Sequence, residues 1–219
     1  QSHAGGGAAL RDVYGYEAFR GVQEEAISAV IRGKDVLAVM ATGGGKSLCY
    51  QIPALVQGAS VVVVSPLVSL MHDQVAALQA RGLSARALAS GASWAELEAV
   101  QFLYVTPEMA ATERFRNALT ELTPCLLAID EAHCVSEWGH DFRPEYRELR
   151  RLRECLPEGT PLMAVTATAT ETTRNDVCCA LGLAAPRRLV TTVDRPNLVY
   201  RGSSPKDPSP LARQARRHA

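Results

Sequence analysis

The chain has 219 residues, 47% of them apolar and 21% charged, and its formal net charge is zero. This composition excludes disordered and fibrous proteins and predicts one substantial globular domain. The charge is uneven, because residues 187–219 hold eight Arg or Lys and two Asp and carry +6, which leaves −6 for residues 1–186. A basic C-terminal tail suits contact with nucleic acid, but a solvated tail without a partner fits the pattern equally well.

Neither a membrane segment nor a secretion signal is expected. No apolar run approaches the length of a bilayer span, and the N-terminus lacks the apolar core of a signal peptide. We therefore expect a cytoplasmic protein, associated with the nucleoid in a bacterium or nuclear in a eukaryote. The six cysteines form no Cys-x-x-Cys pair and have no His-rich neighbourhood, so neither zinc nor disulfides are indicated and buried thiols are expected.

The predicted elements follow one another in a regular order. Residues 1–9 are polar and glycine-rich and are predicted to be disordered or left over from an expression vector. Helices are predicted over 23–31, 46–55, 67–80, 94–100, 108–119, 146–156 and 170–181. Strands are predicted over 36–40, 61–65, 85–88, 102–106, 125–130, 162–166 and 189–193. One domain over 10–202 is expected, followed by a basic tail or linker over 203–219.

The alternation of strands and helices predicts an α/β fold with three layers, in which helices cover both faces of a mostly parallel central sheet. Residues capable of chemistry follow several strands, namely Thr42, Ser65, Thr106, Asp130 and Thr166. Ligands of such sheets bind outside the carboxyl ends of the strands. The sequence therefore predicts its functional site at that edge.

The stretch over 36–47 is typical of a phosphate-binding loop: a short apolar strand, a glycine-rich turn, and Lys46-Ser47 at the start of a helix. Glycines allow several N–H groups to converge on one anion at the positive end of the helix dipole. Lys46 is expected to reach the β and γ phosphates, and Ser47 to ligate Mg²⁺. The predicted nucleotide-binding set is Thr42, Gly43, Gly44, Gly45, Lys46 and Ser47. The alternative is an exposed glycine-rich turn, which requires neither Lys46-Ser47 nor a helix.

A second signal is a pair of acids after a buried strand. The apolar run 126–129 leads directly to Asp130 and Glu131. Asp130 is expected to hold the Mg²⁺ that Ser47 also ligates, and Glu131 to act as the general base for the attacking water. Alternatively, the two acids cap a helix and occupy its first turn. The phosphate-binding loop in the same chain favours the catalytic interpretation.

Together these motifs resemble those of superfamily 2 DEAH helicases of the RecQ family. The resemblance rests on residues 40–47, 65–74, 130–133 and 166–169, and above all on the aromatic-rich segment 134–146. It covers about 14–200 and implies the first RecA-like lobe of a P-loop NTPase. Within the 130–133 motif it adds His133 to the catalytic residues. An RNA-directed DEAH helicase would share Lys46 and Asp130 but not the segment 134–146.

The resemblance also implies how ATP and DNA are bound. Tyr16 and Arg20 match residues that stack on adenine, and Gln23 matches one that bonds its polar edge. The residues matched to DNA binding and to coupling with the ATP site are Ser65, Trp138, His140, Phe142, Arg143, Thr166 and Thr168. Aromatic faces and guanidinium groups can hold single-stranded DNA without reading its sequence. Trp138 could instead pack on the domain, and Thr168 could cap a helix.

By the same resemblance, the parent enzyme is expected to translocate 3′ to 5′ on single-stranded DNA and to unwind partially duplex DNA in repair and recombination. The resemblance ends at 194–198, before the second RecA-like lobe and its arginine finger, so the isolated chain is expected to hydrolyse ATP poorly. The alternative is a nucleotide-dependent fragment that binds DNA or a partner without turnover. The sequence does not indicate an oligomeric state.

Overall fold

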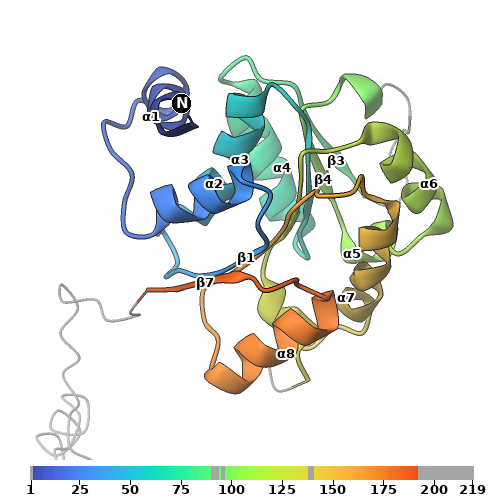
Figure 1. The fold of residues 1–219 in the computed structure, drawn as a ribbon. Coiled ribbons are helices and arrows are strands. Elements are labelled where there is room, and N and C mark those ends of the chain that lie inside the picture. Colours follow the sequence, from blue (N-terminus) through green and yellow to red (C-terminus); the bar gives the residue numbers. More distant parts are fainter. Residues whose placement is uncertain (1, 90–93, 95–96, 138–140, 192–219) are drawn as a thin grey trace, which may run out of the picture.

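The computed structural model describes residues 2–89, 94, 97–137 and 141–191. A single seven-stranded sheet runs through the domain, and helices lie on both of its faces (Figure 1). The predicted tail over 203–219 and the last part of the predicted domain lie outside the described residues. Within the described part of the chain, no helix combines the length and the apolar character needed to cross a bilayer.

Every strand pair in the sheet is parallel, as the sequence predicts. The strands are β1 (Val36–Val39), β2 (Val61–Val64), β3 (Ala85–Leu88), β4 (Phe102–Val105), β5 (Leu126–Ile129), β6 (Leu162–Thr166) and β7 (Arg187–Val190). Their order across the sheet is β3-β4-β2-β5-β6-β1-β7. Because β6 lies between β5 and β1, the carboxyl ends of these three strands are neighbours.

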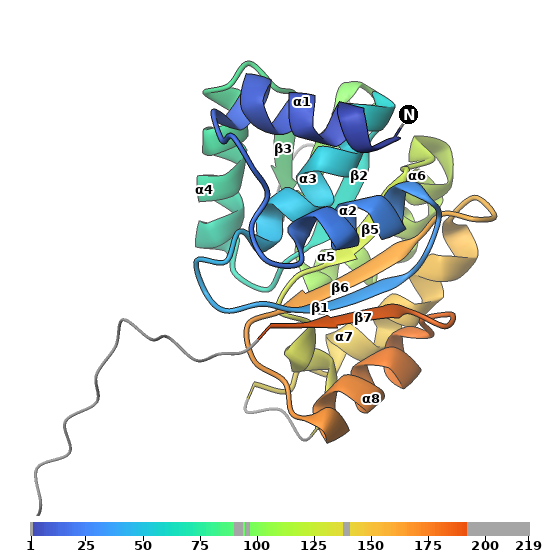
Figure 2. The same cartoon turned by 60° about the vertical axis from the view of Figure 1, so that its left-hand side comes forward.

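The helices form the two outer layers (Figures 1 and 2). On one side are α1 (Ser2–Tyr14), α2 (Gln23–Ile31), α3 (Lys46–Gln57) and α4 (Val68–Gln79), and on the other are α5 (Pro107–Ala110), α6 (Glu113–Leu122), α7 (Glu145–Glu148) and α8 (Glu171–Leu181). The side chains of strand β1 contribute to the cores on both faces of the sheet. Leu37 packs into the core under α6 and α8, whereas Val36 and Ala38 pack into the core under α2 and α3, because successive side chains of a strand point to opposite faces.

The N-terminal segment differs from the prediction. Residues 2–9, expected to be disordered, form the first part of α1. Leu10 explains the difference, because its side chain is only 1% exposed and packs with Ile27, Leu48 and Ile52 in a small core of its own. Burial of an apolar side chain of this size stabilises a helix by roughly 2 kcal/mol, which compensates for the glycines before it.

Four other predicted helices differ from the predictions. Helix α3 continues past Pro53 to Gln57, with the loss of one backbone hydrogen bond. The helix predicted over 108–119 is two helices, because the hydroxyls of Thr106 and Thr112 each cap a separate N-terminus by accepting the N–H groups of Met109 and Phe115. Most of 146–156 is a 3₁₀ segment, η3 (Leu149–Cys155). Of the range 94–100, residues 95 and 96 lie outside the described residues, and Leu97–Ala99 form the 3₁₀ segment η1.

A buried carboxylate ties together the amino ends of three neighbouring strands. Asp35, just before β1, is 3% exposed. Its two oxygens accept bonds from the Arg153 guanidinium at 2.9 Å, from the Leu162 N–H at 2.8 Å and from the Ala184 N–H at 2.7 Å. This carboxylate therefore fixes β1 against β6 and the approach to β7, at the edge of the sheet opposite the predicted site.

Replacing Asp35 should be severely destabilising. Asp35→Ala leaves a part-buried guanidinium and two backbone donors without their acceptor, and we expect the free energy of unfolding to fall by about 3 kcal/mol or more. Glu25→Gln is the matched control, because the ion pair of Glu25 with Arg187 is exposed and should contribute less than about 1 kcal/mol. Urea unfolding of both variants measures the difference, and equal losses would contradict this account.

Candidate functional site

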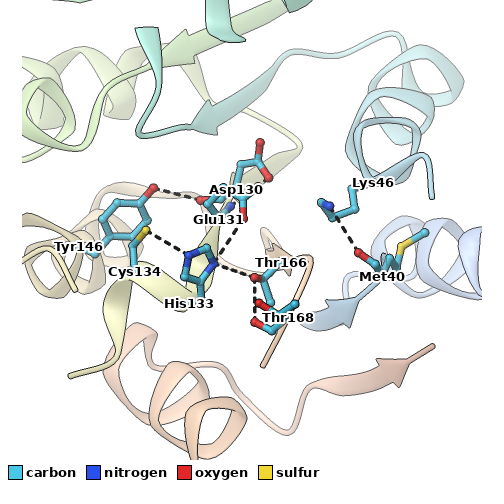
Figure 3. A network of polar contacts seen from close by, with 9 residues as sticks. All are labelled: Met40, Lys46, Asp130, Glu131, His133, Cys134, Tyr146, Thr166 and Thr168. Atoms are coloured by element: carbon cyan, nitrogen blue, oxygen red, sulfur yellow. Dashed lines mark hydrogen bonds and ion pairs between the residues drawn. The ribbon is translucent and has the colours of Figure 1, made fainter. Parts of the chain in front are cut away.

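The site lies where β1, β6 and β5 end side by side. The register pairs Val39 with Thr166 and Ile129 with Ala164, and the Met40 N–H donates to the Thr166 carbonyl at 3.0 Å. The glycine-rich loop follows β1, Thr166 ends β6, and Asp130 follows β5. The structure thus brings together the two motifs that the sequence placed 83 residues apart (Lys46 and Ser47 against Asp130) at one edge of the sheet (Figure 3).

The loop between β1 and α3 has the backbone that its glycines permit. Gly43 and Gly45 have φ of 79° and 74°, in the left-handed region that favours glycine. At Gly44 a Cβ atom would lie 2.8 Å from the Ala41 carbonyl oxygen, so a side chain would force the loop open. The loop ends at the first residue of α3, Lys46, whose Nζ donates to the Met40 carbonyl at 3.4 Å across the turn.

The residues after β5 form a network with the end of β6 (Figure 3). Nδ1 of His133 lies 2.9 Å from Oγ1 of Thr166 and 3.3 Å from Oε2 of Glu131. The Thr166 hydroxyl donates in turn to the carbonyl of Thr168 at 3.3 Å, so its oxygen accepts the His133 N–H. Contacts of the ring with Cys134 and Glu131 raise the pKa of His133 above its usual value near 6.5.

Asp130 is buried, and its neighbours shift the pKa of its carboxyl group in opposite directions. Its side chain is only 7% exposed, and burial, followed by the neighbouring Glu131 charge, raises the pKa of Asp130 to about 6. The Glu131 N–H, which donates to Oδ1 of Asp130 at 2.9 Å, opposes this shift, as do the charges of Lys46 and His133. The Lys46 ammonium is thus close enough to Asp130 to favour the charged form of the carboxylate. A cation bound there would relieve the cost of burying the charge.

Glu131 has an unusual backbone for a residue with a side chain. Its φ of 46° and ψ of 45° are in the left-handed region, which costs a residue other than glycine on the order of 1 kcal/mol. The conformation turns the chain sharply from β5 into the 3₁₀ segment η2 (Ala132–Val135). Backbone strain of this kind is typical of functional sites, and here it places the Glu131 carboxylate beside His133.

The predicted adenine site is a small pocket beside the glycine-rich loop, lined by Tyr16, Arg20, Gln23 and the loop glycines. Arg20 lies 5.9 Å from the centre of the Tyr16 ring, which is 48% exposed. Gln23 is buried, and both ends of its amide are used within the protein. Its oxygen accepts the Arg20 N–H at 2.8 Å, and its nitrogen donates to the carbonyls of Gly44 and Gly45 at 3.0 and 3.2 Å. Gln23 therefore links this pocket to the glycine-rich loop, and its contact with a base stays a prediction.

Part of the predicted DNA-binding set can be placed. Phe142 is 37% exposed, and the Arg143 guanidinium donates to the Pro66 carbonyl at 3.4 Å, which joins the aromatic-rich segment to the stretch after β2. Ser65 is buried, and its hydroxyl has no hydrogen-bond partner among the described residues. A buried hydroxyl without a hydrogen-bond partner lowers the stability of the fold, and a ligand or a moving segment can supply the missing partner. Trp138 and His140 lie outside the described residues.

Two contributors to the site were not predicted. The hydroxyl of Tyr146, a fully buried side chain, donates to the Asp130 carbonyl at 3.0 Å and so supports the turn between the two acids. The backbone N–H of Arg143 donates to the Cys134 carbonyl at 2.8 Å, which holds the aromatic-rich segment against η2. No sequence pattern predicts either contact, because each one joins residues that only the tertiary structure brings together.

The residues present fit a magnesium–triphosphate group. The Ser47 hydroxyl and the Asp130 carboxylate supply oxygen ligands, which Mg²⁺ prefers. The glycine-rich loop at the N-terminus of α3 presents N–H groups and an ammonium to phosphate. A parallel α/β sheet with this loop after β1 and these acids after β5, on either side of β6, defines a nucleotide-binding domain of the RecA-like class.

Comparison with known proteins agrees with this class. The family model for DEAD/DEAH box helicases matches residues 20–177. The chain is 48% identical over 200 residues to the ATP-dependent DNA helicase RecQ of Pasteurella multocida, covering 87% of this chain and 32% of that protein. It is 42% identical over 202 residues to RecQ of Bacillus subtilis, covering 88% and 34%. The chain thus spans about a third of the length of these relatives.

Solved structures show the same fold at lower identity. The helicase MrfA superimposes with a TM-score of 0.64 at 20% identity, covering 84% of this chain and 31% of that one. A hypothetical ATP-dependent RNA helicase from Sulfolobus tokodaii gives a TM-score of 0.63 at 19% identity, covering 81% and 54%. The chain belongs to the DEAD/DEAH box helicase family. The resemblance to RecQ helicases predicted from the sequence is confirmed.

The raised pKa of Asp130 predicts a stability cost in the ligand-free chain. Below about pH 4 the group is protonated in both the folded and the unfolded chain. Above about pH 6 it is ionised in both, and burial of the charge then destabilises the fold. Asp130→Asn keeps the acceptor for the Glu131 N–H without the charge. It should raise the free energy of unfolding by about 1 to 3 kcal/mol at pH 7.5 and by much less at pH 4.

Denaturant unfolding at both pH values tests this prediction. The control is Glu158→Gln, an exposed acid far from the site, which should change stability by less than about 0.5 kcal/mol at either pH. A loss of stability in Asp130→Asn at pH 7.5 would show that the ionised carboxylate holds the ligand-free fold together instead.

Proposed function

We propose that this chain is the ATP-binding and ATP-hydrolysing lobe of a RecQ-type DNA helicase. In the whole enzyme this lobe couples ATP hydrolysis to 3′-to-5′ movement along single-stranded DNA and to duplex unwinding, in DNA repair or recombination. The observation that carries the proposal is that the glycine-rich loop after β1 and the Asp130-Glu131 pair after β5 leave the same end of the sheet, on either side of β6. The 42–48% identity to RecQ helicases supports its DNA-directed form.

The roles of the residues follow from where their side chains lie. Lys46, at the start of α3, neutralises the phosphates that the glycine-rich loop binds. Ser47 and Asp130 hold Mg²⁺, which when bound supplies charge neutralisation at the phosphates. Glu131 accepts a proton from the attacking water, a task that suits a carboxylate beside the metal rather than on it. Tyr16 and Arg20, which both line the small pocket, stack on the base.

A chain of contacts connects the proposed DNA surface with the proposed catalytic base. The Arg143 side chain contacts Pro66, and its backbone N–H donates to the Cys134 carbonyl. Next to Cys134, His133 bonds to Thr166 and to Glu131. A shift of the aromatic-rich segment on DNA can therefore move the His133 ring, and with it the Glu131 carboxylate. Phe142 and the exposed Leu67 and Val68 offer faces on which bases or a second lobe could pack.

Two variants should distinguish the residue needed for hydrolysis from the residue needed for nucleotide binding. Glu131→Gln should keep the affinity for Mg-ATP within about threefold and slow single-turnover hydrolysis by roughly a hundredfold or more. Lys46→Ala should lose both, because it removes the charge that holds the phosphates. Glu148→Gln is the control, since its ion pair with Arg151 is exposed, and it should behave like the unmodified chain.

These rates are measured with excess protein over radiolabelled ATP, with and without single-stranded DNA, and affinity is measured by displacement of a fluorescent nucleotide. Without a second lobe, turnover should be slow even with DNA, because no arginine from another lobe reaches the γ phosphate. Brisk DNA-dependent turnover of the isolated chain contradicts this dependence. Measurable and equal hydrolysis by Glu131→Gln and the unmodified chain contradicts the role of Glu131, whereas the absence of measurable hydrolysis in both favours a binding fragment without turnover.

The nucleic acid can be identified by competition. A fluorescent DNA oligonucleotide bound to the chain in the presence of a non-hydrolysable ATP analogue should be displaced by unlabelled single-stranded DNA at lower concentration than by RNA of the same sequence. Arg143→Ala should weaken binding of any sequence, because a guanidinium contacts phosphate rather than bases. A strong preference for RNA would remove the RecQ-type assignment.

A further inference from the structure

Outside the proposed Mg²⁺ ligands, three side chains of different chemistry converge next to η2. They are His133, Cys134 and Asp141, and one ligand atom from each lies within 4.8 Å of the other two. No sequence motif predicts this cluster, because the chain contains neither a Cys-x-x-Cys pair nor the spacing of known zinc motifs. Two of the residues are adjacent in the chain, and the third is brought back by the loop that follows.

The spacing of these atoms suits a tetrahedral metal ion. Bonds of about 2.0 Å to nitrogen and 2.3 Å to sulfur at the tetrahedral angle place the two ligand atoms about 3.5 Å apart. Nε2 of His133 lies 3.8 Å from Sγ of Cys134. Adding Asp141 gives one nitrogen, one sulfur and one oxygen, a set that zinc and cobalt accept and that magnesium does not favour.

The second nitrogen of the ring is engaged as it is in metal sites. A histidine that binds a metal through one nitrogen usually donates its other N–H to an oxygen, which fixes the orientation of the ring. Nδ1 of His133 makes this contact with Thr166 at 2.9 Å, and a carboxylate oxygen of Glu131 lies 3.3 Å away. Nε2, on the opposite side of the ring, thereby points toward Cys134.

The loop that carries Asp141 is anchored beside the cluster. The Arg143 N–H donates to the Cys134 carbonyl at 2.8 Å, and the Tyr146 hydroxyl donates to the Asp130 carbonyl at 3.0 Å. Both contacts hold the chain after Asp141 against η2 and the end of β5. Asp141 is exposed, which gives an ion a path from solvent to the buried nitrogen and sulfur.

We propose that His133, Cys134 and Asp141 form a binding site for a thiophilic divalent cation such as Zn²⁺, with water as a fourth ligand. The thiol gives its proton to solvent when the ion binds, and the ring binds through its unprotonated Nε2. A bound ion joins η2 to Asp141 in the middle of the aromatic-rich segment. If the proposed function holds, such an ion restrains the link between DNA and Glu131 and lowers DNA stimulation of hydrolysis.

The direct test is a titration of the purified, reduced chain with Co²⁺, without nucleotide or DNA. Co²⁺ should bind one equivalent and give the near-ultraviolet thiolate-to-cobalt charge-transfer absorption, which Zn²⁺ abolishes and excess Mg²⁺ does not. Cys134→Ser should abolish the absorption. Asp141→Asn should weaken binding at least about tenfold, since even the outer partners of a metal site contribute roughly that much.

The matched control is the double variant Cys155→Ser with Cys179→Ser, which removes two more accessible thiols and should keep the absorption and the affinity. Asp141→Asn changes an exposed side chain, so it decides the question even if Cys134→Ser does not fold. The site does not exist if the unmodified chain shows no thiolate absorption at saturating Co²⁺. It is also excluded if the absorption survives in Cys134→Ser, or if Asp141→Asn binds Co²⁺ as tightly as the unmodified chain. None of these readouts depends on ATP hydrolysis.

Discussion

Parallel pairing of β1, β6 and β5 is the constraint on which the site depends. It aligns Val39 with Thr166 and Ile129 with Ala164, so that the loop after β1 and the acids after β5 leave the sheet at the same edge. At the opposite edge, Asp35 holds the beginnings of β1 and β6 in this register with a buried carboxylate. The buried carboxylate of Asp35 thus stabilises one end of the sheet, and the buried carboxylate of Asp130 lies at the other end, where metal binding is proposed.

The site is less stable than a purely structural sheet edge would be. Asp130 is buried with a raised pKa, Glu131 adopts a left-handed backbone, and the Ser65 hydroxyl is buried without a partner among the described residues. Each feature costs free energy in the ligand-free chain, and a bound cation, phosphate or moving segment would offset each one. The strain is concentrated where hydrolysis and DNA contact are proposed to meet.

The sequence predicted the sheet almost completely, because fully buried parallel strands are short apolar runs such as 61–64 and 126–129. It also predicted the glycine-rich loop and the Asp130-Glu131 pair, because each of these motifs consists of consecutive residues. It did not predict α1, because one buried leucine outweighs a glycine-rich composition that suggests disorder. Nor could it show that Gln23 binds the loop carbonyls or that Tyr146 supports Asp130, since these contacts depend on the tertiary path of the chain.

The central claim is that the loop after β1 and the acids after β5 form one site for a single metal–triphosphate group. A crystal structure of the chain with Mg²⁺ and a non-hydrolysable ATP analogue tests it most directly. The account predicts the phosphates in the loop over 43–47, with one Mg²⁺ ion bound by both Ser47 and Asp130 and with Glu131 beside the γ phosphate. Nucleotide bound away from this loop, or a metal ion held by Ser47 with Asp130 turned away from it, would contradict the account.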